Sequence, residues 1–334
     1  MAIRSESVLQ LPHPPVIGTW ASAGGKRESN GPLAAGLDLL YGDNRLDQKS
    51  WEKAEAQMLE ETARTCIEKA GLQPNQIHLA LAGDLQAQCT ASSYAMRQLK
   101  VPFTGLYGAC STMAESLALG ACLASSGVGD NILAMTASHF CAAERQFRMP
   151  LDYGGMRTPT SQWTATAAGC VLLHPAGPGV QVPSVAFGRV QDLQIKDITN
   201  MGAAMAPAAA DTLLRYFQDT GKTPADFDVI FTGDLGKVGS ELLHQLMQRE
   251  GVDLANHQDC GCLLYGDDPS VGAGGSGCGC SAAVLCSHIL PNLMQGVYQK
   301  VLFVATGALM SQSIFLQKES IPGIAHLVEL AAQK

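Results

Sequence analysis

The clearest pattern along the chain is a helix followed by a short apolar run, and it occurs twice. Residues 50–72 read as a helix, and residues 77–85, IHLALAGDL, read as a buried strand that ends in Gly-Asp-Leu. Pro74 marks the connector between them. Ser50 is a plausible N-cap, and Glu52 lies in the first turn, where a carboxylate interacts favourably with the helix dipole. The pattern predicts a helix, a tight connector and a strand.

The same order recurs in the second half of the chain. Residues 207–235 contain a predicted helix, Gly221, Pro224, an acidic connector, an apolar strand and again Gly-Asp-Leu. A second pair, 127–139 and 296–309, passes from a Gly-Val turn through an apolar strand to small residues. The two pairs are offset by roughly 150 and 170 residues, as expected for an internal duplication. Continuous apolar strands are typical of buried parallel sheet.

This repeat predicts an α/β fold in a single domain, 1–334, made of two pseudo-symmetric halves. The predicted halves are residues 1–178 and 179–334. The Pro/Gly-rich stretch 174–184, HPAGPGVQVPS, marks the join between them.

Composition narrows the class of protein. The chain has 334 residues, of which 46% are hydrophobic and 16% charged, enough apolar material for a large core. Its net charge of −8 gives no electrostatic footprint for nucleic acid or an anionic membrane surface. The first residues do not resemble a signal peptide, and no apolar run approaches the roughly 20 residues that span a bilayer. We therefore expect a soluble protein. Eleven irregularly spaced cysteines predict reduced thiols.

Cys110 is the first candidate for chemistry. It follows the strand-like run 101–108 and precedes a helix rich in small residues, so it is predicted to lie at a helix N-terminus. Backbone N–H groups and the helix dipole favour a thiolate there, and such a cysteine can be acylated. The alternative is a small buried hydrophobic side chain.

Two further cysteine and glycine patterns point to neither metal nor nucleotide. The two Cys-x-Cys pairs are spaced more tightly than structural zinc sites prefer, so we expect ordinary thiols and no metal. The glycine-rich segments do not match the dinucleotide-binding pattern. The cysteines concerned are Cys260, Cys262, Cys278 and Cys280.

Six motifs resemble the stage V sporulation protein AD family, a thiolase-fold family of spore-forming bacteria. The resemblance covers essentially the whole chain, and the last three motifs are long and unusual. The motifs are DQKSWEKAE (47–55), LYGACST around Cys110, AERQFRMPLDYGG (143–155), MGAAMAPAAADT (201–212), GAGGSGCGCSA (272–282) and VATGALMSQSIFLQKESIPGIAH (304–326). The resemblance implies the duplicated five-layer αβαβα arrangement of the thiolase superfamily.

The resemblance also shows where this chain departs from the condensing enzymes of that superfamily. Those enzymes need an oxyanion pocket and a base. Here the first corresponding loop, 231–240, holds Asp234 and Lys237 but no histidine. Ser276 stands near the place of a second histidine, and Gly307 stands where thiolases carry an acid/base cysteine. These differences imply a non-catalytic protein.

An enzymatic alternative stays open. His139 ends a predicted strand, and strand ends in α/β sheets open toward ligand crevices, so a Cys110–His139 pair is one possibility. The alternative is a hydrogen-bonded structural histidine. With such a pair, the chain would be a condensing or thioester-cleaving enzyme acting on acyl-CoA or an acyl carrier.

The resemblance supplies a ligand, dipicolinic acid (pyridine-2,6-dicarboxylate), alone or with calcium, and no other cofactor. It implies a role in sporulation and spore germination, in which the protein assists dipicolinate uptake into the developing spore. The expected location is the forespore or spore, soluble or peripheral at the inner spore membrane. Membrane-embedded proteins of the same transport system are the expected partners, and superfamily relatives suggest a homodimer.

A planar dianion needs cationic or N–H donors and an apolar or thiol-lined slot for its ring. Arg145 and Arg148 are three residues apart, so in a helical turn their guanidinium groups would share one face. The alternative is that they form ion pairs with Glu144 or Asp152.

Two other segments are candidates for the same ligand. Ser276 and Gly277 lie in a glycine-rich turn whose N–H groups could face an anion, or the turn could be purely structural. Asp192 and Asp197 could supply oxygen atoms to the calcium, or be solvated loop carboxylates.

Overall fold

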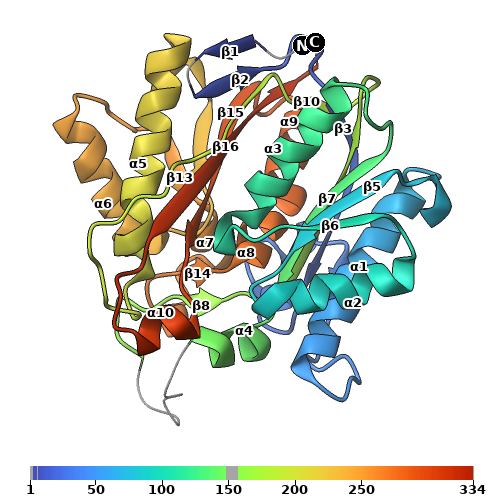
Figure 1. The fold of residues 1–334 in the computed structure, drawn as a ribbon, viewed down its shortest axis with the longest axis horizontal. Coiled ribbons are helices and arrows are strands. Elements are labelled where there is room, and N and C mark those ends of the chain that lie inside the picture. The colour runs from blue at the N-terminus through green and yellow to red at the C-terminus, as the bar shows by residue number, and fades with distance from the viewer. Residues whose placement is uncertain (1–2, 6, 148–156, 334) are drawn as a thin grey trace.

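The computed structural model describes residues 3–5, 7–147 and 157–333, whose strands form two similar sheets with helices between them and on both outer faces (Figure 1).

The first sheet has the strand order β6-β5-β7-β9-β3. Strands β6, β5 and β7 are parallel, whereas β9 runs antiparallel to both β7 and β3. The strands are β3 (Val16–Gly24), β5 (Leu79–Gly83), β6 (Phe103–Gly105), β7 (Ile132–Ser138) and β9 (Ala167–His174).

The second sheet repeats this order and these directions as β13-β12-β15-β16-β11. Its strands are β11 (Ser184–Ala186), β12 (Val229–Thr232), β13 (His257–Asp259), β15 (Lys300–Ala308) and β16 (Gly323–Ala332). Strand β10 (Val180–Gln181), inside the predicted join, pairs with β3 and with β16 and so links the sheets. The matching topology supports two halves, and their boundary stays a prediction.

Short strands complete the sheets. Strand β2 (Val8–Gln10) pairs with β11, and β1 (Ile3–Ser5) pairs with β2. Strand β4 (Leu39–Leu40) pairs with β3. Strands β8 (Trp163–Thr164) and β14 (Gly275–Ser276) form a separate two-stranded sheet.

Six helices form three layers around the two sheets. α1 (Trp51–Lys69) and α2 (Thr90–Leu99) cover the outer face of the first sheet, and α5 (Met201–Thr220) and α6 (Gly236–Arg249) lie on the outer side of the second. α3 (Thr112–Ser125) contacts strands of both sheets and packs against α8 (Cys278–Val284). The shorter helices are α4 (Phe140–Phe147), α7 (Cys260–Tyr265), α9 (Leu290–Met294) and α10 (Gln312–Leu316).

Small residues allow α3 to lie between two sheets. Its buried face includes Ala114, Ala118 and Ala121. At Gly120 an added Cβ atom would lie 2.7 Å from a methyl carbon of Leu173, on β9. A larger residue there would push the helix away from the first sheet.

The predicted elements are confirmed, although several of their ends differ by a few residues, as at Lys69, where α1 ends. The Ser50 hydroxyl accepts a hydrogen bond from the N–H of Lys53 (3.3 Å) and caps α1 as expected. α5, however, begins at Met201, before the predicted start at Pro207, and Asn200 caps it. A proline usually marks a first helical turn, but this one lies inside the helix.

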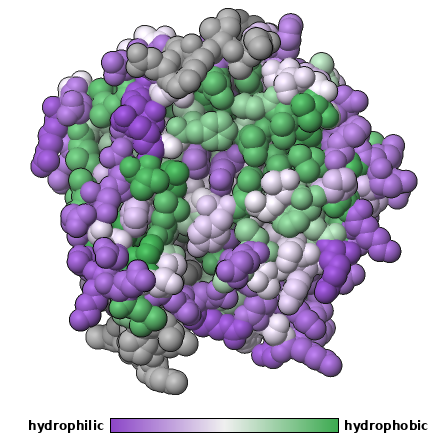
Figure 2. All heavy atoms as spheres, viewed as in Figure 1, coloured by the Kyte–Doolittle hydropathy of each residue, from purple (hydrophilic) through white to green (hydrophobic). Residues whose placement is uncertain are grey.

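The face in Figure 2 shows apolar side chains in two areas, one from the top toward the right and one on the left, with weakly polar and polar ones between them and along both sides. Among the described residues, no helix combines the length and the apolar character that crossing a bilayer requires.

Candidate functional site

The turn that carries Cys110 lies where the two halves meet. It connects β6 to α3, and Ala109 adopts a left-handed conformation (φ 51°) just before the cysteine. The buried Cys110 sulfur lies 4.0 Å from Oγ of Ser276, on β14 just before α8. The turns that precede the two central helices therefore face each other.

Asp234, two residues after β12, ties the Ser276 turn to strand β15 beside the Cys110 turn. Its carboxyl group accepts hydrogen bonds from the Gly277 N–H (2.8 Å), the Ser276 hydroxyl (3.1 Å) and the Thr306 hydroxyl (2.9 Å). We call Cys110, Asp234, Ser276, Gly277 and Thr306 the Cys110 cluster. The predicted candidates Cys110, Ser276 and Gly277 are thus brought together. Sequence reasoning missed Thr306, which lies within an apolar strand.

The electrostatics of the cluster keep the thiol protonated. Burial raises the pKa of Cys110 well above its ordinary value, and the negative charge of Asp234 raises it further. Burial also raises the pKa of Asp234 to about 7, although the Gly277 N–H partly offsets this effect. The prediction that the helix N-terminus favours a thiolate is therefore wrong, because burial and a neighbouring carboxyl group outweigh it.

A small cavity of about 20 Å³ adjoins the sulfur. This volume holds about one water molecule. Its walls are Leu85, Tyr107, Ala109, Cys110, Met201, Ser276, Ala308 and Met310. A larger ligand requires side chains to move, and two of the walls are methionines, whose flexible chains adapt readily.

The structure leaves no room for a cysteine at position 307. A Cβ atom on Gly307 would lie 2.2 Å from the carbonyl oxygen of Gly108 and 3.1 Å from the backbone nitrogen of Ser111. Strand β15 passes directly against the Cys110 turn, so the structure as it stands has no room for any side chain at this position.

His139 is engaged elsewhere. Its Nε2 lies 2.8 Å from the carbonyl oxygen of Asn44, and Nδ1 accepts the N–H of Cys141 (3.2 Å). The ring lies 5.4 Å from that of Trp51, and burial lowers the pKa of the imidazole. Because both ring nitrogens are occupied and neither bonds to Cys110, the structure does not form the Cys110–His139 pair.

Arg145, the arginine candidate within the described residues, lies outside the Cys110 cluster. Arg145, on α4, forms an ion pair with Glu52 at the start of α1, and its side chain is 47% exposed. The alternative prediction, that Arg145 forms an ion pair, is confirmed, but its partner is Glu52 of another helix and not one of the two predicted carboxylates. Arg148 lies outside the described residues.

The predicted calcium-binding carboxylates shape a loop before α5. Asp192 accepts bonds from the N–H of Gln194 (2.8 Å) and the hydroxyl of Ser320 (2.6 Å). Asp197 accepts the N–H (2.9 Å) and the hydroxyl (2.7 Å) of Thr199. Both aspartates are exposed. In the described part of the chain, no group of three or more His, Cys, Asp and Glu residues could hold a metal ion.

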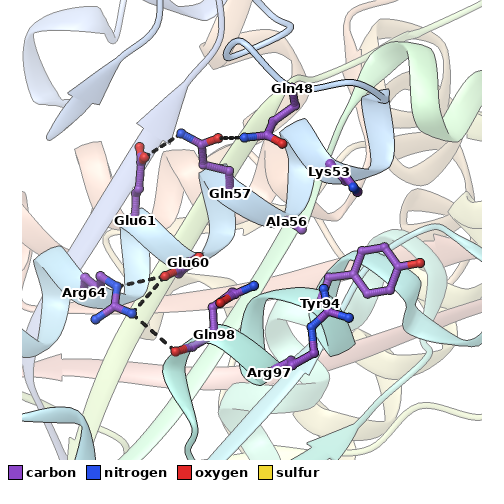
Figure 3. Close-up of a pocket in the computed structure, with 10 residues that line it drawn as sticks. All are labelled: Gln48, Lys53, Ala56, Gln57, Glu60, Glu61, Arg64, Tyr94, Arg97 and Gln98. Carbon is purple, nitrogen blue, oxygen red and sulfur yellow. Dashed lines mark hydrogen bonds and ion pairs between the residues drawn. The ribbon is translucent and has the colours of Figure 1, made fainter.

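A larger groove of about 580 Å³ lies on the outer layer, between α1 and α2 (Figure 3). Its polar walls largely pair with one another, as in the ion pair of Arg64 with Glu60 (2.9 Å) and the bond from Gln57 to Glu61 (2.8 Å). None of its lining residues belongs to the Cys110 cluster.

The chain was then compared with known proteins. The sequence model of the family described as "Stage V sporulation protein AD" matches residues 5–331. The stage V sporulation protein AD of Bacillus subtilis (strain 168) is 42% identical over 327 residues, which cover 98% of this chain and 97% of the relative. The chain belongs to the stage V sporulation protein AD family. The predicted resemblance is confirmed.

Solved structures share the fold at low sequence identity. The 3-oxoacyl-[acyl-carrier-protein] synthase III of Aquifex aeolicus VF5 has a TM-score of 0.59 and 12% identity, covering 95% of this chain and 99% of that chain. A variant of OleA from Xanthomonas campestris has the same score and identity, with 99% and 100% coverage. These matches confirm the predicted thiolase-like α/β fold of this family member.

Proposed function

We propose that this member of the stage V sporulation protein AD family binds dipicolinic acid or its calcium complex and assists its uptake into the developing spore. Membership of a sporulation protein family supports the cellular role. The ligand comes from the family resemblance seen in the sequence.

The position of Asp234 beside Cys110 is the observation that best supports ligand binding over catalysis. A condensing enzyme needs a group that accepts the thiol proton. Here the nearby carboxyl group accepts three hydrogen bonds from other groups and also interacts with the thiol itself, and its negative charge disfavours the thiolate. Together with the burial of the sulfur, this charge favours a neutral thiol over a nucleophilic thiolate.

The cavity walls suit the ring of a planar acid better than its carboxylates. Met201, Met310 and Leu85 offer apolar contacts, and the polar lining groups besides the thiol are the hydroxyls of Ser276 and Tyr107. Carboxylates prefer cationic donors. In the proposal, such donors lie outside this cavity, and Arg148 stays a sequence-based candidate.

We further propose that the protein acts in the forespore or at the inner spore membrane beside membrane-embedded proteins of the same system. The half-buried Leu119 and Leu123 of α3 leave part of their apolar side chains accessible, which supports the proposed homodimer.

Calorimetric titration with dipicolinate, with and without calcium, tests this function. We expect saturable binding that survives Cys110→Ser, because a hydroxyl replaces the thiol at similar size. Met201→Trp should weaken binding by about tenfold or more, since overfilling a packed site typically costs 1–3 kcal/mol. Met294→Trp is the matched control, because Met294 is 52% exposed. Failure of the unaltered protein to bind, or equal affinity in Met201→Trp, would contradict the proposal.

A further inference from the structure

A second groove shares a wall with the Cys110 cavity. It lies between the loop before α5 and the segment around α10, and its volume is about 180 Å³, compared with about 20 Å³ for the cavity. Met310 lines both. The groove is lined by Lys196, Ile198, Met310, Ile314, Phe315, Lys318, Glu319 and Ile321.

Hydrogen bonds between two distant segments hold this groove in shape. The N–H of Ile321 donates to the carbonyl oxygen of Ile195 (2.7 Å), and the Lys196 ammonium donates to the carbonyl oxygen of Lys318 (2.8 Å). Lys318 itself adopts a left-handed backbone conformation (φ 59°). Such strained positions often occur at functional sites, where the surrounding structure maintains them.

The chemistry of the walls is specific. Five apolar side chains, including Phe315, can contact the faces of a flat ring. Two ammonium groups, those of Lys196 and Lys318, lie at the same groove, and neither forms an ion pair with a carboxylate of the described residues. Glu319 is the one acidic residue of the lining. The groove is therefore a locally cationic, apolar site on a chain of net charge −8.

We propose that this groove binds a planar aromatic dicarboxylate, with Lys196 and Lys318 facing its carboxylates, and that Met310 separates this outer site from the Cys110 cavity. The identity of the ligand as dipicolinate rests on the proposed function. The groove supplies the two features that the cavity lacks, namely volume for a ring and cations for its carboxylates. The segment 304–326, one of the family motifs, forms much of its wall.

The test is a calorimetric titration of the full chain with two probes. One is dipicolinate, and the other is isophthalate, which has the same carboxylate spacing but no ring nitrogen and so chelates calcium less well. Lys318→Glu reverses one charge and leaves the backbone bond to Lys196 in place. Lys196→Met combined with Lys318→Met removes both charges but keeps the apolar stems. Lys300→Met, at an exposed lysine on β15, is the control.

We expect both altered proteins to bind dipicolinate roughly tenfold or more weakly, because each loses charge-assisted hydrogen bonds to the carboxylates, which are stronger than bonds between neutral groups. The control should match the unaltered protein.

The outcomes separate this inference from the proposed function. Dipicolinate binding that is unchanged in both lysine variants overturns the groove and leaves the function standing. Lysine-dependent binding of isophthalate without binding of dipicolinate supports the groove and contradicts the function. If neither acid binds the unaltered protein, both are overturned.

Discussion

Gly307→Ala is expected to lower the free energy of unfolding by about 3 kcal/mol, within the range measured for overpacked cores. The added methyl carbon would lie 2.2 Å from the carbonyl oxygen of Gly108, a backbone atom that cannot rotate away. To relieve the clash, the Cys110 turn and β15 must separate. Because Cys110 faces Ser276 across this contact, dipicolinate binding should weaken in parallel.

Gly42→Ala is the matched control, since no atom lies within 4 Å of a Cβ atom at Gly42. Urea unfolding of both variants checks the prediction. Equal stability of Gly307→Ala and the unaltered protein would show that β15 does not pass as close to the Cys110 turn as the structure describes.

Asp234→Asn is expected to remove a pH dependence of stability. The pKa of Asp234 is about 7 in the folded protein, against an ordinary value of 3.8. Between these values the folded state binds more protons than the unfolded state, so this group lowers the stability as pH rises from about 4 to just above 7, and its contribution then stays constant. The full difference is on the order of 4 kcal/mol. An asparagine oxygen can still accept from Gly277 and Ser276, while its amide donates to Thr306.

The measurement is the unfolding midpoint at pH 6 and at pH 8. The unaltered protein should lose more stability between these values than Asp234→Asn, and the exposed Asp253→Asn should behave like the unaltered protein. Ionised Asp234 also repels a dianion, so dipicolinate affinity should fall across the same range and stay constant in Asp234→Asn. Identical pH profiles in all three proteins would mean that Asp234 is already ionised at pH 6.

Much of the fold follows from local sequence patterns. The repeated Gly-Asp-Leu endings of residues 77–85 and 207–235 mark equivalent strands, β5 and β12, because burial on both faces requires continuous apolar runs. The helix boundary at Pro207 was harder to predict, because it depends on the cap provided by Asn200 rather than on the proline.

The site was only partly predictable, since its contacts join residues far apart in the chain. The pattern around Cys110 predicts the turn, but not that Asp234 from the other half lies beside it and raises the thiol pKa. Spacing likewise places Arg145 on a helix without indicating that its partner is Glu52. His139 follows its strand as predicted, but the sequence does not show that its ring forms a hydrogen bond with the carbonyl oxygen of Asn44, which is distant in the chain.

The central claim is that Cys110 lies in a binding cavity as a neutral thiol, with no hydrogen bond to a histidine of the described residues, and acylation tests it most directly. The folded protein is incubated with acetyl-CoA at pH 7.5, and its intact mass is measured beside that of Cys110→Ser. We predict no added acetyl group on either protein. An acetyl adduct on the unaltered protein that is absent from Cys110→Ser would contradict the claim and favour a thioester-cleaving or condensing enzyme.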